Sequence, residues 1–318
     1  MDFSKTLSDQ AWKRPAREEK KKGRYYEPTF SGALSFCRRP YSEDYKDADI
    51  VVTGMPFDSA VSYRPGCRLG PRAIRAASVQ LAELTAFPWN FDPFEQLSVI
   101  DAGDCYLNQH DPLTVPDAIY NHACQIIASG AKMLTLGGDH FISYPLLKAH
   151  VERYGPLALL QFDAHCDTWD MGGAPLDHGT MMLRAIEEGL ILPECSLQVG
   201  IRTQNESWHG MEVITAPEIQ RRGIDTGLAR IRERVGTRPL YVSFDIDCLD
   251  PAFAPGTGTP VSGGLASWQA LELIRGLEGL NMVGFDLVEV SPPFDHAEIT
   301  ALAAAHIAHD WLAIMARR

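Results

Sequence analysis

The sequence has little that would place the chain in a membrane or outside the cell. No run of apolar residues reaches the length expected of a membrane span, and the first residues, Met1 to Lys5, lack the apolar core of a signal peptide. The seven cysteines are scattered, odd in number and include no CxxC pair. These absences favour a cytoplasmic protein with reduced thiols over a membrane protein or a small disulfide scaffold.

Positive charge is also scarce. The 318 residues include 29 lysines and arginines against 41 aspartates and glutamates, which gives a formal net charge of −12. An acidic chain repels phosphate backbones and attracts cations. We therefore expect no nucleic-acid partner and no membrane partner, and the charge weakly favours a small cationic one.

The N-terminal segment differs from the rest of the chain. Residues 13–15 and 19–24 are rich in lysine, arginine and glutamate and show no helical apolar periodicity. We predict a charged surface arm over residues 1–45, followed by a single domain over residues 46–318. No internal repeat or linker divides this domain.

Short apolar runs alternate with amphipathic stretches from about residue 48 onward. Alternation of this kind predicts an α/β domain with a parallel sheet covered by helices on both faces. The expected strands are residues 50–52, 97–100, 132–136, 157–162, 196–199, 240–244 and 282–285, and the clearest helices are 115–129, 144–153 and 267–277.

Carboxylates and imidazoles follow three of the predicted strands. His140 follows one strand, Asp163, His165 and Asp167 follow a second, and Asp245 and Asp247 follow a third. Ligands gather at the carboxyl ends of parallel strands. Alternate side chains of an extended backbone point the same way, so we expect each set to converge on one crevice.

Such a cluster predicts bound metal. Four carboxylates packed together without cations would repel one another and would be costly to bury. A single catalytic zinc usually takes three protein ligands, whereas this set suits two ions that share carboxylates. Oxygen and imidazole ligands without thiolate favour two Mn²⁺, with Ni²⁺, Co²⁺ or Zn²⁺ as alternatives. Cys166 and Cys248 lie inside the ligand motifs but should point away from the metals; a redox role for Cys166 stays open.

The motifs resemble those of the ureohydrolase family, which contains arginases and agmatinases. The resemblance covers roughly residue 45 to the end and implies a three-layer α/β/α arginase-like fold with a central, mainly parallel sheet. It rests on Gly137-Gly138-Asp139-His140, Asp163-Ala164-His165-Cys166-Asp167, Asp177-His178-Gly179-Thr180, Ser243-Phe244-Asp245-Ile246-Asp247-Cys248-Leu249-Asp250-Pro251 and Asp286-Leu287-Val288-Glu289-Val290.

The resemblance also implies roles for individual residues. One ion would be held by His140, Asp163, Asp167 and Asp245, and the other by Asp163, His165, Asp245 and Asp247. Activated water would attack the carbon of a guanidinium held by Glu289, which releases urea and an amine. Asp167 and the shuttle residue His178 would supply the amine's proton. Family members commonly form homotrimers or homohexamers.

Agmatine is the substrate that the sequence favours. Residues 87–92 and 286–304 look more like agmatinase than arginase, and Asp170 would face the distal ammonium of agmatine. Leu69 and Trp169 depart from the family pattern, which keeps guanidinobutyrate and other small guanidines open. A single-zinc deacylase and a non-catalytic partner subunit are the alternatives from other classes.

Overall fold

One parallel sheet forms the centre of the molecule. The computed structural model describes residues 28–170, 172–173 and 176–317. Its strands are β1 (Ile50–Met55), β2 (Val99–Asp104), β3 (Lys132–Gly137), β4 (Ala158–Phe162), β5 (Leu197–Ile201), β6 (Glu212–Thr215), β7 (Leu240–Asp245) and β8 (Met282–Val288). They form an eight-stranded sheet in the order β2-β1-β3-β8-β7-β4-β5-β6, and every neighbouring pair is parallel.

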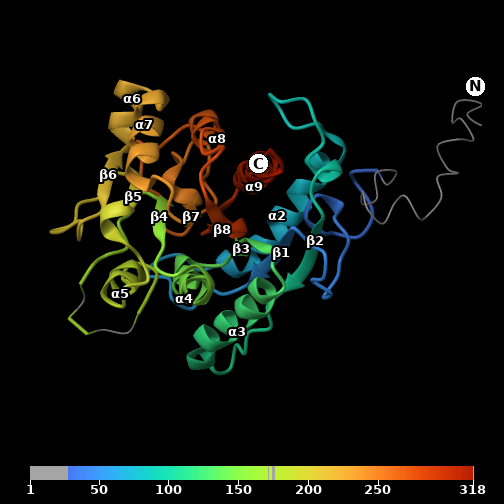
Figure 1. The fold of residues 1–318 in the computed structure, drawn as a ribbon, viewed down its shortest axis with the longest axis horizontal. Helices are drawn as coiled ribbons and strands as arrows, with labels where there is room; N and C mark the ends of the chain where they lie inside the picture. Colours follow the sequence, from blue (N-terminus) through green and yellow to red (C-terminus); the bar gives the residue numbers. More distant parts are fainter. Residues whose placement is uncertain (1–27, 171, 174–175, 318) are drawn as a thin grey trace, which may run out of the picture.

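Helices cover both faces of this sheet (Figure 1). The α-helices are α2 (Gly70–Ser78), α3 (Val115–Ala128), α4 (Ser143–Tyr154), α5 (Met181–Glu187), α6 (Ala216–Arg222), α7 (Ile224–Val235), α8 (Ser267–Arg275) and α9 (Ile299–Ala316). Apolar residues of α3, α4 and α5 share one buried cluster, whereas those of α2, α6, α7, α8 and α9 share another. The predicted three-layer arrangement is therefore confirmed.

The strands can be predicted from the sequence because the inner ones are buried on both faces. All seven predicted strands are present, and β1, β4, β5, β7 and β8 are buried at every residue. Parallel strands covered on both faces read as continuous apolar runs. The strand that the sequence did not reveal, β6, lies at the edge of the sheet, is four residues long and has a single buried residue.

Helix α9 corrects one expectation about apolar segments. Among the described residues it is the one helix with the length and composition of a membrane span, and 78% of that span is buried inside the protein. Ala304, Trp311 and Ile314 all belong to the main core cluster. Its apolar composition therefore reflects burial within the domain, where the whole circumference of a helix can be apolar.

Part of the predicted arm packs against the domain. Residues 1–27 lie outside the described residues, whereas the side chains of Phe36 and Arg39 are buried. The backbone N–H of Phe36 donates to Asp101 Oδ2 at 2.7 Å, and the Arg39 guanidinium lies 3.8 Å from the centre of the Phe94 ring. Residues 36–39 are therefore buried in the domain, whereas residues 28–34 are exposed as predicted for the arm, and the boundary between arm and domain stays a prediction.

The sheet order brings distant motifs together. β8, the last strand in sequence, lies between β3 and β7, and β4 lies on the other side of β7. The carboxyl ends of β3, β8, β7 and β4 are therefore adjacent although they span residues 137–288. A crevice at these strand ends is where an open α/β sheet binds its ligands.

Candidate metal centre and active site

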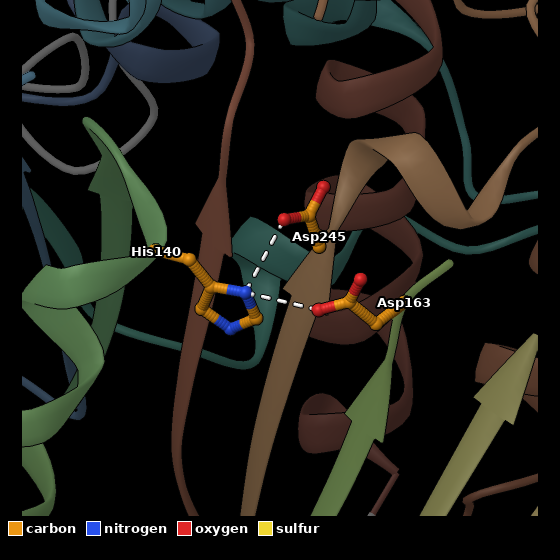
Figure 2. A group of neighbouring side chains, drawn as sticks. All are labelled: His140, Asp163 and Asp245. Atoms are coloured by element: carbon orange, nitrogen blue, oxygen red, sulfur yellow. Dashed lines mark ion pairs between the residues drawn. The ribbon is translucent and has the colours of Figure 1, made fainter. Parts of the chain in front are cut away.

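Three strand ends bring one imidazole against several carboxylates. His140 follows β3, Asp163 follows β4 and Asp245 ends β7, and their side chains point toward one another (Figure 2). His140 Nδ1 lies 3.0 Å from Asp163 Oδ2 and 3.2 Å from Asp245 Oδ2. The turn before His140 needs glycine, because a Cβ at Gly138 would collide with the backbone oxygen of Phe57.

A second group lies beside the first and shares Asp163 with it. His165 Nδ1 is 3.1 Å from Asp247 Oδ2 and 3.5 Å from Asp163 Oδ1. The two oxygens of Asp163 thus face different imidazoles, Oδ2 toward His140 and Oδ1 toward His165. Ligand atoms of His140, Asp163 and Asp245 form one possible metal site, and those of Asp163, His165 and Asp247 form another. A carboxylate facing two sites is the arrangement that a two-ion centre requires.

The predicted convergence is observed, but its predicted cause is wrong. β4 ends at Phe162, so the residues that follow are not extended strand. Asp167 has a left-handed backbone with φ of 53°. Asp247 lies in a 3-10 turn, and its backbone N–H donates to Asp245 Oδ1 at 2.8 Å. Turns, not strand alternation, aim these carboxylates at the crevice.

Two carboxylates of the centre have raised pKa values and are harder to ionise than free aspartates. Burial and the charge of Asp163 raise the pKa of Asp167 to about 7. Burial and the charges of Asp247 and Asp163 raise the pKa of Asp245 well above its usual value. Burial lowers the pKa of His165, but Asp247 and Asp163 outweigh it and raise that pKa to about 12. Cations would relieve this repulsion.

His140 provides the clearest fit to a cation. It is 1% exposed, and its Nδ1 makes no hydrogen bond of acceptable geometry. Three carboxylate oxygens nevertheless lie 2.8–3.2 Å from that atom, the nearest being Asp167 Oδ2. A buried nitrogen without a hydrogen-bond partner, facing several carboxylate oxygens, suits a lone pair directed at a metal ion.

A buried chain of hydroxyl groups fixes the other nitrogen of His140. His140 Nε2 lies 2.8 Å from Ser243 Oγ, and this hydroxyl donates to Asp286 Oδ1 at 2.7 Å. Asp286 also accepts from the hydroxyls of Ser143 and Tyr241, both at 2.8 Å. With Nε2–H donating to Ser243, the lone pair is on Nδ1, the tautomer that binds metal.

A cavity of about 320 Å³ opens over the centre. It is lined by Ser62, His140, His165, Asp167, Trp169, Asp177, His178, Gly179, Thr180, Asp245 and Thr259. Among these described residues there is no lysine or arginine, whereas three are aspartates. Four of the predicted site residues are not part of this lining: Asp163, Asp170, Asp247 and Glu289. The cavity therefore suits a positively charged molecule.

His178 connects the cavity to Glu289. Its Nδ1 lies 3.0 Å from Glu289 Oε1, and its Nε2 accepts from the backbone N–H of Ser62 at 3.0 Å. Burial lowers the pKa of His178, but Glu289 outweighs it and raises that pKa to about 9. The Ser62 N–H opposes this charging, because Nε2 must stay unprotonated to accept its hydrogen bond.

Glu289 is held by three donors of the protein. It is 1% exposed and accepts from His178 Nδ1, from the backbone N–H of His140 at 2.9 Å and from the thiol of Cys67 at 2.9 Å. Burial and the charge of Glu289 raise the pKa of Cys67 well above its usual value, so that this thiol stays a donor. In this arrangement Glu289 acts on the cavity through His178, and a direct contact with substrate stays a prediction.

Two further predicted residues lie apart from the centre. Asp170 is exposed and accepts from the backbone N–H of Gly172 at 2.8 Å. It borders a neighbouring cavity of about 220 Å³ together with Arg184 and Glu187. Its contact with substrate stays a prediction. Cys166 is fully buried, and burial raises the pKa of its thiol, which disfavours oxidation.

Known proteins resemble this chain in both fold and sequence. The arginase family profile matches residues 48–313. An agmatinase from Chromobacterium violaceum is 58% identical over 295 residues, or 92% of each chain. The crystal structure of a hypothetical agmatinase from Burkholderia thailandensis has a TM-score of 0.92 and 54% identity over 98% of both chains. Proclavaminate amidino hydrolase from Streptomyces clavuligerus has a TM-score of 0.87 at 40% identity, covering 92% of this chain and 99% of that one.

Proposed function

Because this chain belongs to the arginase family, we propose that it hydrolyses agmatine to urea and putrescine at a pair of metal ions. The identity to agmatinases over most of the chain supports this choice of reaction. The two adjoining ligand groups that share Asp163 support the pair of ions.

We propose manganese for both ions, with nickel, cobalt and zinc as the alternatives. The first ion would be held by His140, Asp163, Asp167 and Asp245, and the second by Asp163, His165, Asp245 and Asp247. The ligand atoms in the two groups are carboxylate oxygens and imidazole nitrogens, with no thiolate among these described residues, and this set suits manganese. When bound, the ions supply water that is activated for attack on the guanidinium carbon at neutral pH.

The charge of the cavity favours agmatine over 4-guanidinobutyrate as the substrate. Agmatine has a guanidinium at one end and an ammonium at the other, whereas 4-guanidinobutyrate ends in a carboxylate. Asp167 and Asp245 would hold the ions, so Asp177 is the aspartate of the lining that stays free to attract a cation, and no cationic side chain lies among the described lining residues. A distal ammonium is attracted into this field and a distal carboxylate is repelled by it.

The protein's own groups orient the substrate and move its proton. His178 borders the cavity beside Ser62, and the Glu289 carboxylate stabilises its protonated form. Protonation of His178 Nε2, in place of the hydrogen bond that this atom accepts from the Ser62 N–H, would position a proton for the departing amine, with Asp167 as the nearer acceptor of the water's proton. The surrounding buried side chains keep both groups in place while the cavity holds the guanidinium over the ligand cluster.

Urea release is the direct test of this proposal. Purified protein activated with Mn²⁺ is given agmatine, 4-guanidinobutyrate and arginine in parallel, and the amine product is identified alongside urea. We expect kcat/KM to be highest for agmatine, with putrescine as the product. A higher value for 4-guanidinobutyrate would instead make the chain a guanidinobutyrase, and no urea from any of the three would refute agmatine as the substrate.

We also propose a cytoplasmic homotrimer or homohexamer. All seven cysteines are free, as expected in a reducing compartment. Sedimentation of the purified protein and fractionation of the producing cells test the two parts of this proposal separately.

A further inference from the structure

A buried amide group lies directly beneath the metal centre. Gln161 is on β4, two residues before Asp163, and is fully buried. Its Nε2 donates to Asp163 Oδ2 at 2.8 Å and to Asp167 Oδ2 at 3.2 Å. One amide nitrogen therefore holds two of the carboxylates that would otherwise repel each other.

The orientation of this amide is fixed from its other side. Gln198 on β5 is paired in register with Gln161, and its Nε2 donates to Gln161 Oε1 at 2.8 Å. The same Gln198 nitrogen donates to the backbone oxygen of Cys166 at 2.6 Å. Because ionised carboxylates only accept, the Gln161 oxygen must face Gln198 and its nitrogen must face the two aspartates.

The amide acts on one side of the centre. Both carboxylate oxygens that it holds, Oδ2 of Asp163 and Oδ2 of Asp167, are also the oxygens nearest to His140 Nδ1, at 3.0 and 2.8 Å. The contacts of the second group, between His165, Asp247 and Asp163 Oδ1, do not include this amide. Gln161 therefore contacts the carboxylate oxygens that face His140, whereas the Asp163 oxygen that faces His165 makes no contact with this amide.

We propose that Gln161 is a positioning residue for the ion on the His140 side, and that Gln198 acts through it. The amide holds Asp163 and Asp167 in their binding orientation before the ion enters, so that less order has to be created on binding. This inference rests on the two-ion centre proposed above and adds to it a difference between the two ions that depends on a neutral side chain.

The test is a calorimetric titration of Mn²⁺ into protein stripped with EDTA. Gln161→Met keeps the length of the side chain and removes both amide groups. We expect one ion to bind about 10- to 100-fold more weakly than in the wild type and the other to stay within about twofold. Gln198→Met, which leaves the Gln161 oxygen without its donor, should weaken the same ion by a smaller factor.

Gln269→Met is the matched control. Gln269 is another buried glutamine, but its side chain caps α8 by accepting from the N–H of Ala266, away from the metal centre. This variant should bind both ions as the wild type does. Melting temperatures of the stripped proteins show how much each substitution disturbs packing alone.

Several outcomes would overturn the assignment. Wild-type affinities for both ions in Gln161→Met, or equal weakening of both ions, would leave the amide without a specific role. If Gln161→Met does not fold, Gln198→Met decides: selective loss of one ion supports the assignment, and unchanged binding overturns it. Wild-type protein that binds fewer than two ions would instead overturn the two-ion centre itself, and absence of agmatine hydrolysis with normal binding would overturn only the substrate.

Discussion

Removal of a single hydroxyl, in Ser243→Ala, should weaken metal binding without unfolding the protein. Ser243 is fully buried on β7. Its hydroxyl contacts His140 Nε2 at 2.8 Å and donates to Asp286 Oδ1 at 2.7 Å. In the variant, the Nε2–H of the metal-binding tautomer would be buried without an acceptor, whereas Asp286 keeps the hydroxyls of Ser143 and Tyr241.

The expected magnitude follows from the unmade hydrogen bond. A buried donor left without a partner costs about 1–3 kcal/mol. This cost falls on the metal-bound state, because the ion requires the lone pair on Nδ1 and therefore the proton on Nε2. At about 1.4 kcal/mol for each factor of ten, the affinity for the ion at His140 should fall about 5- to 150-fold.

Tyr241→Phe provides the matched control for this experiment. It also removes one hydroxyl that donates to Asp286, at 2.8 Å, but it leaves the contact between His140 and Ser243 in place. Titration of Mn²⁺ into each stripped protein should show a large loss for Ser243→Ala and a small one for Tyr241→Phe. Equal losses, or no loss for Ser243→Ala, would refute the reasoning that the imidazole tautomer limits affinity.

Three further predictions test other parts of the structure. His178→Asn should lower kcat for urea release about 100-fold or more with two ions still bound, so full activity would remove His178 from proton transfer. Cys67→Ala takes one donor from Glu289 and should lower kcat/KM roughly two- to tenfold, with recovery in Cys67→Ser; an equal defect in both would indicate packing instead. Burial lowers the pKa of His150 to about 4 from 6.5, so the unfolded state takes up the proton first and stability falls as pH drops from 6.5 toward 4. In urea unfolding, His150→Leu should therefore lose about 2 kcal/mol less than the wild type between pH 7.5 and pH 5, and parallel losses would contradict the burial effect.

The charged residues of the metal centre can be predicted from the sequence. Asp163 and Asp245 stand directly after apolar runs, His140 follows another after a short turn, and the carboxyl ends of parallel strands meet at one edge of a sheet. These two facts were enough to predict that the cluster converges. They did not fix the path of the backbone, which depends on a left-handed residue at Asp167 and a 3-10 turn through Asp247.

Neutral groups around the centre could not be found in the same way. Gln161 and Ser243 are neutral polar residues within mainly apolar strands, and whether such a residue faces a ligand depends on strand neighbours that the sequence does not give. Ser62 and Cys67 reach His178 and Glu289 from a segment more than a hundred residues away in sequence. Contacts of this kind follow from the tertiary structure, because no local pattern marks them.

The position of β8 (Met282–Val288) determines when, during synthesis, the metal centre can form. β8 is the neighbour that joins β3 to β7, so without it the sheet consists of two parts, β2-β1-β3 and β7-β4-β5-β6. His140 belongs to the first part, whereas Asp163 and Asp245 belong to the second. Since synthesis proceeds from the N-terminus, a growing chain contains every predicted ligand by Asp247 yet cannot bring them together until β8 has emerged. We therefore expect metal uptake to follow completion of the chain, and a chain that ends before Met282 to contain all the ligands without forming the centre.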